Sequence, residues 1–355
     1  METKFRKIGI LTSGGDAPGM NCVIKSVTCA AIDKGVEVVG IIGGYSGLIN
    51  DKIRPLTKND VAGIVSHGGT FLYSDRCDEF KTEAGMQKAI ATCKKHNIDG
   101  IVAIGGDGTF RGATDLSIRG IPCIGVTGTI DNDITASDIT VGYDTAMNSV
   151  LTMGDALRDT CESHARCNVI EVMGRNAGYI AIETGLALGA IGVAVQEIPF
   201  DKESLFKRMN EARADGRRSF IVVVAEGLGA AFSEGLVKEI EERTGIETRF
   251  VRPAHIVRGG IPTLVDRNLA LKSGYKAVEL LLKGVSDVVI CSRHDQIVPI
   301  EIKFALILDR MYKNKLKEDD LEGFTDKQLA EMKAICKERH DYFVDMYEVI
   351  NGVNR

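Results

Sequence analysis

The sequence lacks the features that mark several large classes of protein. No apolar run reaches the roughly 18 residues that suggest a membrane span, and the N-terminal stretch METKFRKIGILTSGG has neither the apolar core nor the cleavage site of a signal peptide. The nine cysteines form no CxxC pair, which argues against a zinc site or a disulfide framework and favours reduced thiols. A formal net charge of −5 is not the basic excess of a nucleic-acid-binding protein. We therefore expect a cytoplasmic protein that binds neither membranes nor nucleic acids.

The composition that remains is typical of a globular protein with a full core. Hydrophobic residues make up 44% of the 355 residues and charged residues 26%, which is ordinary usage. This length suits one large domain or two ordinary ones.

Short apolar runs alternate with helical segments along the chain. The runs that predict strands are KIGIL, EVVGIIGG, GIVAI, IPCIGV, NVIEVM, VAVQEI and SFIVVVAE. Segments such as DKESLFKRMNEARADG and SEGLVKEIEERTG have helical character. This alternation predicts an α/β protein with mainly parallel sheets covered by helices, in which ligands bind beyond the carboxyl ends of the strands.

The chain is expected to divide near residues 138–145, before a long helix that begins around Asp144. We expect one α/β domain over residues 1–140, a second over 141–300, and a C-terminal helical segment over 301–355. Part of the C-terminal region is expected to return to the first domain. The tail predicts a helix capped at Thr325 or Asp326.

Glycine-rich turns follow three of the predicted strands and carry Asp, Thr or Ser. In TSGGDAPGMN, Gly14 and Gly15 let backbone N–H groups approach an anion. In GGDGT, Gly106 and Gly108 flank Asp107 just before a helix, whose positive end favours a phosphate. Neither turn has the GK[ST] ending of a Walker loop, and any one of them alone is equally a tight connection. Together they favour a polyphosphate site.

The stretch VTGTIDNDIT places two carboxylates directly after a buried strand. In a strand-like segment residues two apart face the same side, so Asp131 and Asp133 would both point into one cleft. With Asp107 they suit Mg²⁺ bound to a nucleotide triphosphate, since this ion needs only one or two carboxylates. One carboxylate would serve the metal and the other would accept the proton of an attacking hydroxyl. An Asx turn is the alternative, and it accounts for only one aspartate.

The motifs TSGGDAPGMN, GGDGT, TGTIDND, EVMGR and HIVRGG, in this order, resemble the ATP-dependent 6-phosphofructokinases of the bacterial type. The similarity runs from about residue 6 to residue 300. It implies two similar three-layer α/β/α domains, with the active site in the cleft between them, and a homotetramer. It also implies transfer of the γ-phosphoryl group of Mg-ATP to the 1-hydroxyl of fructose 6-phosphate, a step of glycolysis.

The resemblance also implies roles for single residues. Asp131 would be the general base, while Thr129, Arg76 and Arg175 would hold or neutralise the transferring group. Mg²⁺ would be held by Asp107, with Asp133 in support. The nucleotide would be bound in the first domain by Gly15, Arg76, Cys77, Gly106, Asp107, Gly108 and Thr109.

The second domain would bind the sugar phosphate, and arginines suit this task because the guanidinium binds phosphate in bidentate fashion. The implied substrate-binding residues are Thr129, Asp131, Arg166, Met173, Gly174, Arg175, Glu226, Arg249, His255 and Arg258. Arg166 and Arg249 would reach the site from a neighbouring subunit.

Two further comparisons with the family concern the phosphoryl donor and the effector site. Pyrophosphate-using relatives carry Asp and Lys where this chain has Gly108 and Gly128, so the glycines favour ATP. The effector site of bacterial relatives would here draw on Lys25, Lys58, Arg158 and Arg217. Cys29 and Ile191 depart from its charged pattern, which leaves the effectors open.

Other functions remain as alternatives at this point. GGDGT also occurs in NAD kinases, although those enzymes need no sugar-phosphate arginines. A pyrophosphate-dependent phosphofructokinase, a kinase of another sugar phosphate and a non-catalytic regulatory subunit are the others. The three aspartates at 107, 131 and 133 argue against the last.

Overall fold

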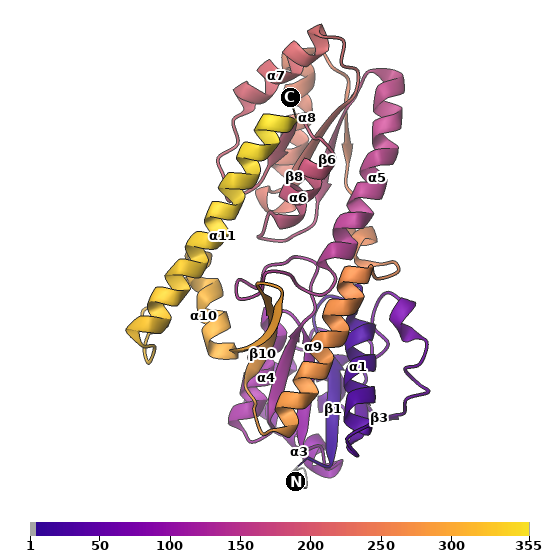
Figure 1. The fold of residues 1–355 in the computed structure, drawn as a ribbon, viewed down its shortest axis with the longest axis vertical. Coiled ribbons are helices and arrows are strands. Elements are labelled where there is room, and N and C mark those ends of the chain that lie inside the picture. Colours follow the sequence, from indigo (N-terminus) through magenta and orange to yellow (C-terminus); the bar gives the residue numbers. More distant parts are fainter. Residues whose placement is uncertain (1–4, 355) are drawn as a thin grey trace. The chain divides into compact units, whose positions relative to one another are not determined.

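The computed structural model describes residues 5–354, which form two compact α/β units (Figure 1). Unit 1 contains the described residues up to Ile130, together with Ile134–Thr145 and Arg258–Met332. Unit 2 contains Asp131–Asp133, Ala146–Val257 and the residues from Lys333 onward.

The seven strands of unit 1 form a sheet in the order β11-β10-β5-β4-β1-β2-β3. The pairs β1–β2, β1–β4, β4–β5 and β5–β10 are parallel, and the two edge pairs are antiparallel. The strands are β1 (Lys7–Thr12), β2 (Glu37–Ile41), β3 (Ile53–Leu56), β4 (Gly100–Gly105), β5 (Cys123–Thr127), β10 (Val288–Arg293) and β11 (Gln296–Glu301).

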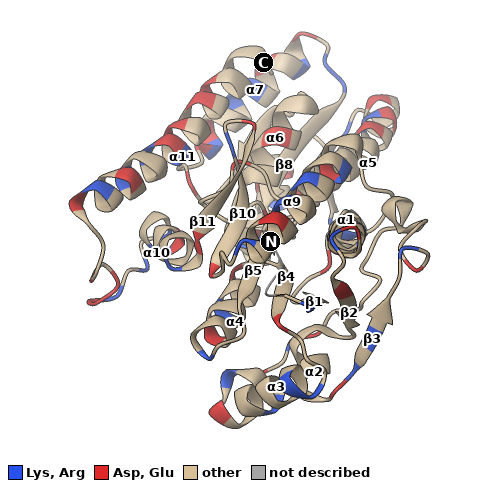
Figure 2. Ribbon diagram, turned by 60° about the horizontal axis from the view of Figure 1, so that its bottom comes forward, with Lys and Arg blue, Asp and Glu red and all other residues tan. Residues whose placement is uncertain are grey.

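Helices cover both faces of this sheet. Figure 2 shows β1, β4 and β5 between α1 and α9 on one side and α3 and α4 on the other. Helices α1 and α9 pack together, and Ser26 Oγ donates to the carbonyl of Leu271 at 2.6 Å. The helices are α1 (Met20–Ile32), α2 (Gly44–Ile49), η1 (Ile64–Ser66), η2 (Glu79–Lys81), α3 (Glu83–Lys95), α4 (Asp107–Ile118), α9 (Leu264–Leu282) and α10 (Ile302–Tyr312).

Unit 2 has a four-stranded, fully parallel sheet in the order β7-β8-β6-β9. Side chains of α7 and α8 pack on one face and enclose the buried Phe206, Phe220 and Leu236. The strands are β6 (Cys167–Val172), β7 (Gly192–Ala194), β8 (Phe220–Ala225) and β9 (Thr248–Val251). The other elements are α6 (Tyr179–Ala187), α7 (Lys202–Ala214), η3 (Glu226–Leu228) and α8 (Ala230–Thr244). Three more elements contain residues of both units: α5 (Tyr143–His164), η4 (Ala254–Arg258) and α11 (Asp326–Val353).

The predicted mainly parallel α/β class is confirmed, and each of the seven expected apolar runs overlaps a strand. The N-terminus of α11 is also where it was expected, because Thr325 and Gln328 cap each other, with Gln328 N donating to Thr325 Oγ1 at 3.3 Å. Four strands were not foreseen: β3, β9, β10 and β11.

The compact units differ from the expected division at residues 140 and 300. Strand β10 pairs in parallel with β5, so the chain from Arg258 to Met332 belongs to unit 1. The C-terminal segment does not stand alone, because it divides after Met332 and the rest of α11 joins unit 2. Each segment belongs to the unit whose sheet or helices it packs against.

Within residues 5–354, no helix combines the length and apolar character needed to cross a membrane. All nine cysteines are free thiols, and six of them are buried.

Candidate active site

The first glycine-rich turn follows β1, and the segment before Arg76 is tied to it. Thr12 Oγ1 donates to the carbonyl of Tyr73 at 2.7 Å, and Ser74 Oγ donates to that of Gly14 at 2.6 Å. Arg76 is exposed and Cys77 is partly exposed. The structure therefore brings the expected Gly15 turn and the Arg76 segment to the same end of β1.

The GGDGT turn lies beside it, at the carboxyl end of the neighbouring strand β4. Gly106 is the N-cap of α4, and Asp107 is the first residue of that helix. Thr109 Oγ1 donates to the carbonyl of Ser13 at 3.1 Å, which joins the two turns. Backbone N–H groups and the positive end of α4 make this edge of unit 1 suitable for phosphates.

Asp107 forms an ion pair with the side chain of Arg111. Arg111 donates to both of its carboxylate oxygens, through Nε at 2.9 Å and Nη2 at 2.8 Å. No group of three or more His, Cys, Asp or Glu side chains that could hold a metal occurs within residues 5–354. The carboxylate chemistry still suits Mg²⁺, which takes most of its ligands from water and phosphate. Arg111 would have to release one oxygen of Asp107 for that contact.

Arg258, expected among the sugar-phosphate ligands, lies in unit 1 against the Gly15 turn. Its Nη1 is 4.0 Å from Asp16 Oδ1, and a β-carbon at position 15 would sit 2.1 Å from the same nitrogen. Its Nε is buried and has no hydrogen-bond acceptor among the described residues. A guanidinium with an unused buried donor is a group that an anion would stabilise.

The segment after β5 is not the strand that the spacing of Asp131 and Asp133 suggested. Strand β5 ends at Thr127, and Asn132 has a left-handed backbone with φ of 50°. Alternation of side chains therefore breaks down between the two aspartates, and the prediction that they share one face for that reason is wrong. Asp131 is 3% exposed, whereas Asp133 is partly exposed. Thr129 N donates to the carbonyl of Val141 at 3.1 Å.

The loop after β6 is a tight turn that only glycine permits. Gly174 has φ of 147°, and a β-carbon there would lie 2.4 Å from the carbonyl oxygen of Ala177. Glu226 Oε1, just after β8, accepts from the backbone N of Gly174 at 3.1 Å and of Arg175 at 2.8 Å. Arg175 Nε then lies 3.9 Å from Asp131 Oδ2. Four of the predicted residues thus meet in unit 2, with partly exposed Met173 beside them in the chain.

Arg166 and Arg249 lie at the amino ends of strands in the same sheet, whereas the Gly174 turn follows the carboxyl end of β6. Arg166 precedes β6, and Arg249 is the second residue of β9. Both pair with Glu247, and Arg166 Nε lies 2.8 Å from its Oε2. The six residues of β6 separate Arg166 from the Gly174 turn, a length of about 20 Å at the usual rise per residue. The structure therefore does not bring them to Arg175 within one chain. His255 is exposed in η4, beyond the carboxyl end of β9.

Sequence reasoning missed polar residues at the carboxyl edge of this sheet. Glu197, after β7, accepts from Gly178 N at 2.8 Å, and burial raises the pKa of its carboxyl. Arg252, after β9, donates to the buried Glu171 at 2.6 Å. The rule that found Asp131, a charge at the end of a predicted strand, could not find them, because β9 was not predicted and Glu197 lies inside the predicted run VAVQEI.

Gly108 and Gly128, the two glycines expected to favour ATP over pyrophosphate, have different surroundings. A β-carbon at Gly108 would meet nothing within 4 Å, so a side chain there would extend into open space. One at Gly128 would lie 3.0 Å from Met20 Cε and 3.1 Å from Ile104 Cγ2. Close packing therefore gives a second reason for glycine at 128. Tyr45 is buried, and its hydroxyl donates to the carbonyl of Thr109 at 2.6 Å.

The four cations proposed for an effector site are engaged with the protein itself. Lys25 donates to the carbonyl of Ala62 at 2.9 Å, and Lys58 pairs with Asp33. In unit 2, Arg158 donates to the carbonyl of Leu188 and Arg217 to those of Ser219 and Gly189.

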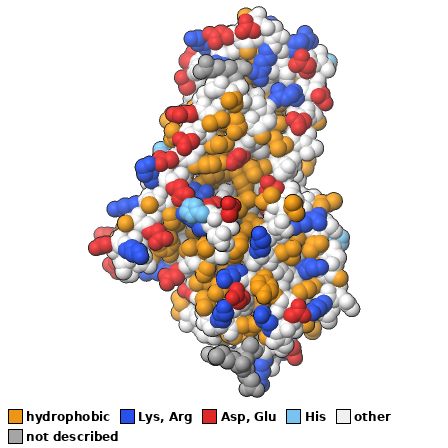
Figure 3. All heavy atoms as spheres, viewed as in Figure 1, with side chains coloured by type: hydrophobic (Ala, Val, Ile, Leu, Met, Phe, Trp, Pro, Cys, Tyr) orange, Lys and Arg blue, Asp and Glu red, His pale blue; other side chains and the backbone are white. Residues whose placement is uncertain are grey.

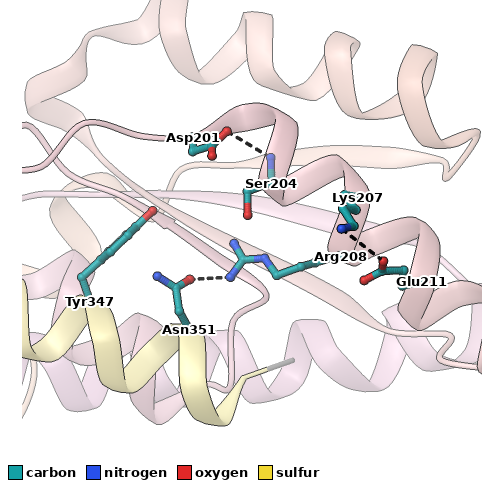
Figure 4. A pocket seen from close by; sticks show the side chains of 7 residues that line it. All are labelled: Asp201, Ser204, Lys207, Arg208, Glu211, Tyr347 and Asn351. Carbon is teal, nitrogen blue, oxygen red and sulfur yellow. Dashed lines mark hydrogen bonds and ion pairs between the residues drawn. The ribbon is translucent and has the colours of Figure 1, made fainter.

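A pocket of about 470 Å³ lies elsewhere in unit 2, between α7 and α11 (Figure 4). It contains none of the predicted site residues, and two acidic groups balance its two basic ones. Its lining residues are Asp201, Ser204, Lys207, Arg208, Glu211, Tyr347 and Asn351.

Known proteins resemble this chain over most of its length. Residues 7–281 match the family model described as Phosphofructokinase. The chain is 48% identical over 298 residues to the ATP-dependent 6-phosphofructokinase of Bacillus licheniformis, covering 84% of this chain and 93% of that protein. It is 46% identical over 312 residues to the enzyme of the same name from Clostridium botulinum, covering 88% and 97%.

Solved structures share the fold. Phosphofructokinase from Saccharomyces cerevisiae superposes with a TM-score of 0.84 at 26% identity, covering 97% of this chain. This chain spans about half of that longer one, 49%. The pyrophosphate-dependent enzyme of Marinobacter aquaeolei, at 23% identity and a TM-score of 0.74, covers 84% of this chain and 83% of that one and shares the fold alone. With a family match over most of its length and curated relatives of nearly equal size, the chain belongs to the phosphofructokinase family.

Proposed function

We propose that this chain transfers the γ-phosphoryl group of ATP to the 1-hydroxyl of fructose 6-phosphate, giving fructose 1,6-bisphosphate and ADP in the cytoplasm. The observation that carries the proposal is the pair formed by buried Asp131 and Arg175 beside the Gly174 turn. The names of the relatives from Bacillus licheniformis and Clostridium botulinum support ATP as the donor.

In this proposal Asp131 takes the proton from the sugar hydroxyl. Arg175 Nε lies 3.9 Å from Asp131 Oδ2, so a cation stands beside the carboxylate that is proposed to accept the proton. Arg175 also offers positive charge for the phosphoryl oxygens as charge spreads over them. Met173, Gly174, Glu226 and His255 complete the sugar-phosphate group of unit 2, while Thr129 steadies the transferring phosphoryl.

The nucleotide phosphates are proposed to bind at the joined turns of unit 1. Support comes from the bond between Thr109 and Ser13, which places the Gly15 and Gly106–Thr109 backbones side by side. Arg76, with Cys77 next to it, is exposed at the same end of β1 and would neutralise charge on the γ-phosphoryl. Arg258 adds a donor there for an anionic group.

Asp107 and Asp133 are the residues proposed to hold Mg²⁺. When bound, the ion would neutralise charge on the nucleotide phosphates. Arg111 is the partner that would yield an oxygen of Asp107.

Self-association is part of the proposal. Arg166 and Arg249 lie at the amino ends of β6 and β9, and Arg175 follows the carboxyl end of β6. We infer that they serve the sugar phosphate of a neighbouring copy in a homotetramer. Unit 1 carries apolar surface that suits such contacts, and Figure 3 shows hydrophobic side chains spread over the face with α9. Ile261, shortly before this helix, and Leu264, its first residue, are 68% and 74% exposed.

The test is the initial rate with fructose 6-phosphate and Mg²⁺, with ATP and pyrophosphate compared as donors. Turnover with ATP and little or none with pyrophosphate is expected. Turnover mainly with pyrophosphate would keep the family but overturn the proposed donor. No turnover with either donor, in a protein shown to be folded, would overturn the proposed reaction.

A further inference from the structure

Helix α11 lies beyond residue 281, where the match to the family ends, yet it contacts the helix that follows the Gly174 turn. Phe343 of α11 is fully buried, and its ring lies 4.6 Å from that of Tyr179, centroid to centroid. Next to it, the Tyr342 hydroxyl donates to Glu183, one turn further along α6. Both contacts lie within unit 2.

Tyr179 is the first residue of α6, so these contacts fix the point at which the loop after β6 becomes helix. The tilted rings, at 45° to each other, form a directional contact. The guanidinium of Arg339, also from α11, lies 5.7 Å from the centre of the Tyr179 ring and adds a cation–π attraction.

The loop between β6 and α6 has little freedom to absorb a movement of Tyr179. Ala177 N donates to the carbonyl of Gly174 at 2.9 Å, and Gly178 N donates to Glu197 at 2.8 Å. Glu226 holds the N–H groups of Gly174 and Arg175. A shift of Tyr179 therefore passes through a closed turn to the backbone that carries the Arg175 guanidinium.

We propose that Phe343 is a positioning residue, which acts through Tyr179 to hold the Met173–Gly178 loop in the geometry that binds the sugar phosphate. This inference rests on the proposed function, because it assigns the loop to that substrate. It gives the C-terminal helix a part in substrate binding, although the helix carries no residue of the predicted site.

Helix α11 also offers a matched control, because it has a second attachment that does not involve α6. Asn351 accepts from Arg208 of α7 at the rim of the pocket (Figure 4). Asn351→Ala weakens the docking of α11 without touching Tyr179. Phe343→Leu removes the ring contact and keeps most of the apolar volume.

The first measurement is hydrogen–deuterium exchange of the full chain without substrate. Phe343→Leu should speed exchange of the amides of Gly174 and Arg175 by about tenfold, and Asn351→Ala should leave them unchanged. Unchanged exchange in Phe343→Leu would overturn the proposal. Because this readout needs no turnover, it decides the coupling even if the wild-type chain does not phosphorylate fructose 6-phosphate, an outcome that would count against the proposed function alone.

The second measurement is steady-state kinetics with both substrates varied. Phe343→Leu should raise KM for fructose 6-phosphate by about fivefold while kcat and KM for Mg-ATP stay within about twofold, the pattern of lost substrate binding. Equal changes in both KM values, or the same change in Asn351→Ala, would show a merely structural role and overturn the proposal. If Phe343→Leu does not fold, Tyr342→Phe replaces it, since loss of the bond to Glu183 should shift both readouts in the same direction by less.

Discussion

Arg258 and Gly15 lie so close together that a β-carbon at position 15 would sit 2.1 Å from Nη1 of the arginine. The glycine thus has a second use beyond the proposed exposure of its N–H group to a phosphate. It gives the guanidinium room against the turn after β1, where the arginine also approaches Asp16 at 4.0 Å.

Gly15→Ala should therefore impair function with little loss of stability. The added methyl group meets the far end of a flexible side chain, so Arg258 can swing away at small cost. We expect KM for fructose 6-phosphate or for ATP to rise about tenfold and Tm to change by less than about 2 °C. Gly63→Ala is the control, since its β-carbon meets nothing within 4 Å. Unchanged KM values in Gly15→Ala would contradict a role for Arg258 at this turn.

Asp131→Asn should lower kcat by about 10³-fold or more, because an amide cannot accept the proton of the sugar hydroxyl. Binding of fructose 6-phosphate, measured calorimetrically without ATP, should be nearly intact, since the side chains are similar in size. A variant that keeps more than about a tenth of wild-type turnover would remove Asp131 as the general base.

Arg166→Ala and Arg175→Ala should each lose most activity alone and recover part of it when mixed. The two arginines lie at opposite ends of strand β6, so a site that needs both draws them from different copies. Mixed oligomers would contain some sites with both arginines intact. The measurement is activity after the variants are dissociated together and reassembled, and no recovery would argue against a shared site.

Asp266 predicts a pH dependence of stability in unit 1. Burial raises the pKa of its carboxyl from 3.8 to about 6, against opposing hydrogen bonds from Thr145 and Gly142 N. Between those pH values the folded state binds more protons than the unfolded state. The stabilising contribution is therefore present below about pH 4 and lost as the pH rises through about 6.

The measurement is the free energy of unfolding of the wild type minus that of Asp266→Asn. It should fall by about 3 kcal/mol between pH 4 and pH 7. Asp60→Asn is a contrasting variant, because hydrogen bonds from Thr57 lower the pKa of Asp60. The contribution of Asp60 should be lost as the pH falls instead. A difference for Asp266→Asn that stays constant with pH would contradict the prediction.

The class of the fold could be predicted from local patterns. Apolar runs such as GIVAI are long enough for a buried strand and too short for a helix, and all seven runs overlap strands. The helix cap at Thr325 is also local, because its partner Gln328 lies only three positions later in the chain. The unforeseen strands β10 and β11 were missed because a strand that joins a distant edge has no local sign of its partner.

By itself the sequence determined which residues are candidates for the chemistry, since glycine turns and strand-end charges depend on neighbours in the chain. Only the tertiary structure decided their grouping. It separated Arg166 from Arg175 by the length of β6, placed Arg258 against Gly15, and broke the alternation between Asp131 and Asp133 through the left-handed backbone of Asn132. The physical reason is that hydrogen bonding and packing between segments far apart in the chain set these positions, and no short stretch of sequence contains both partners.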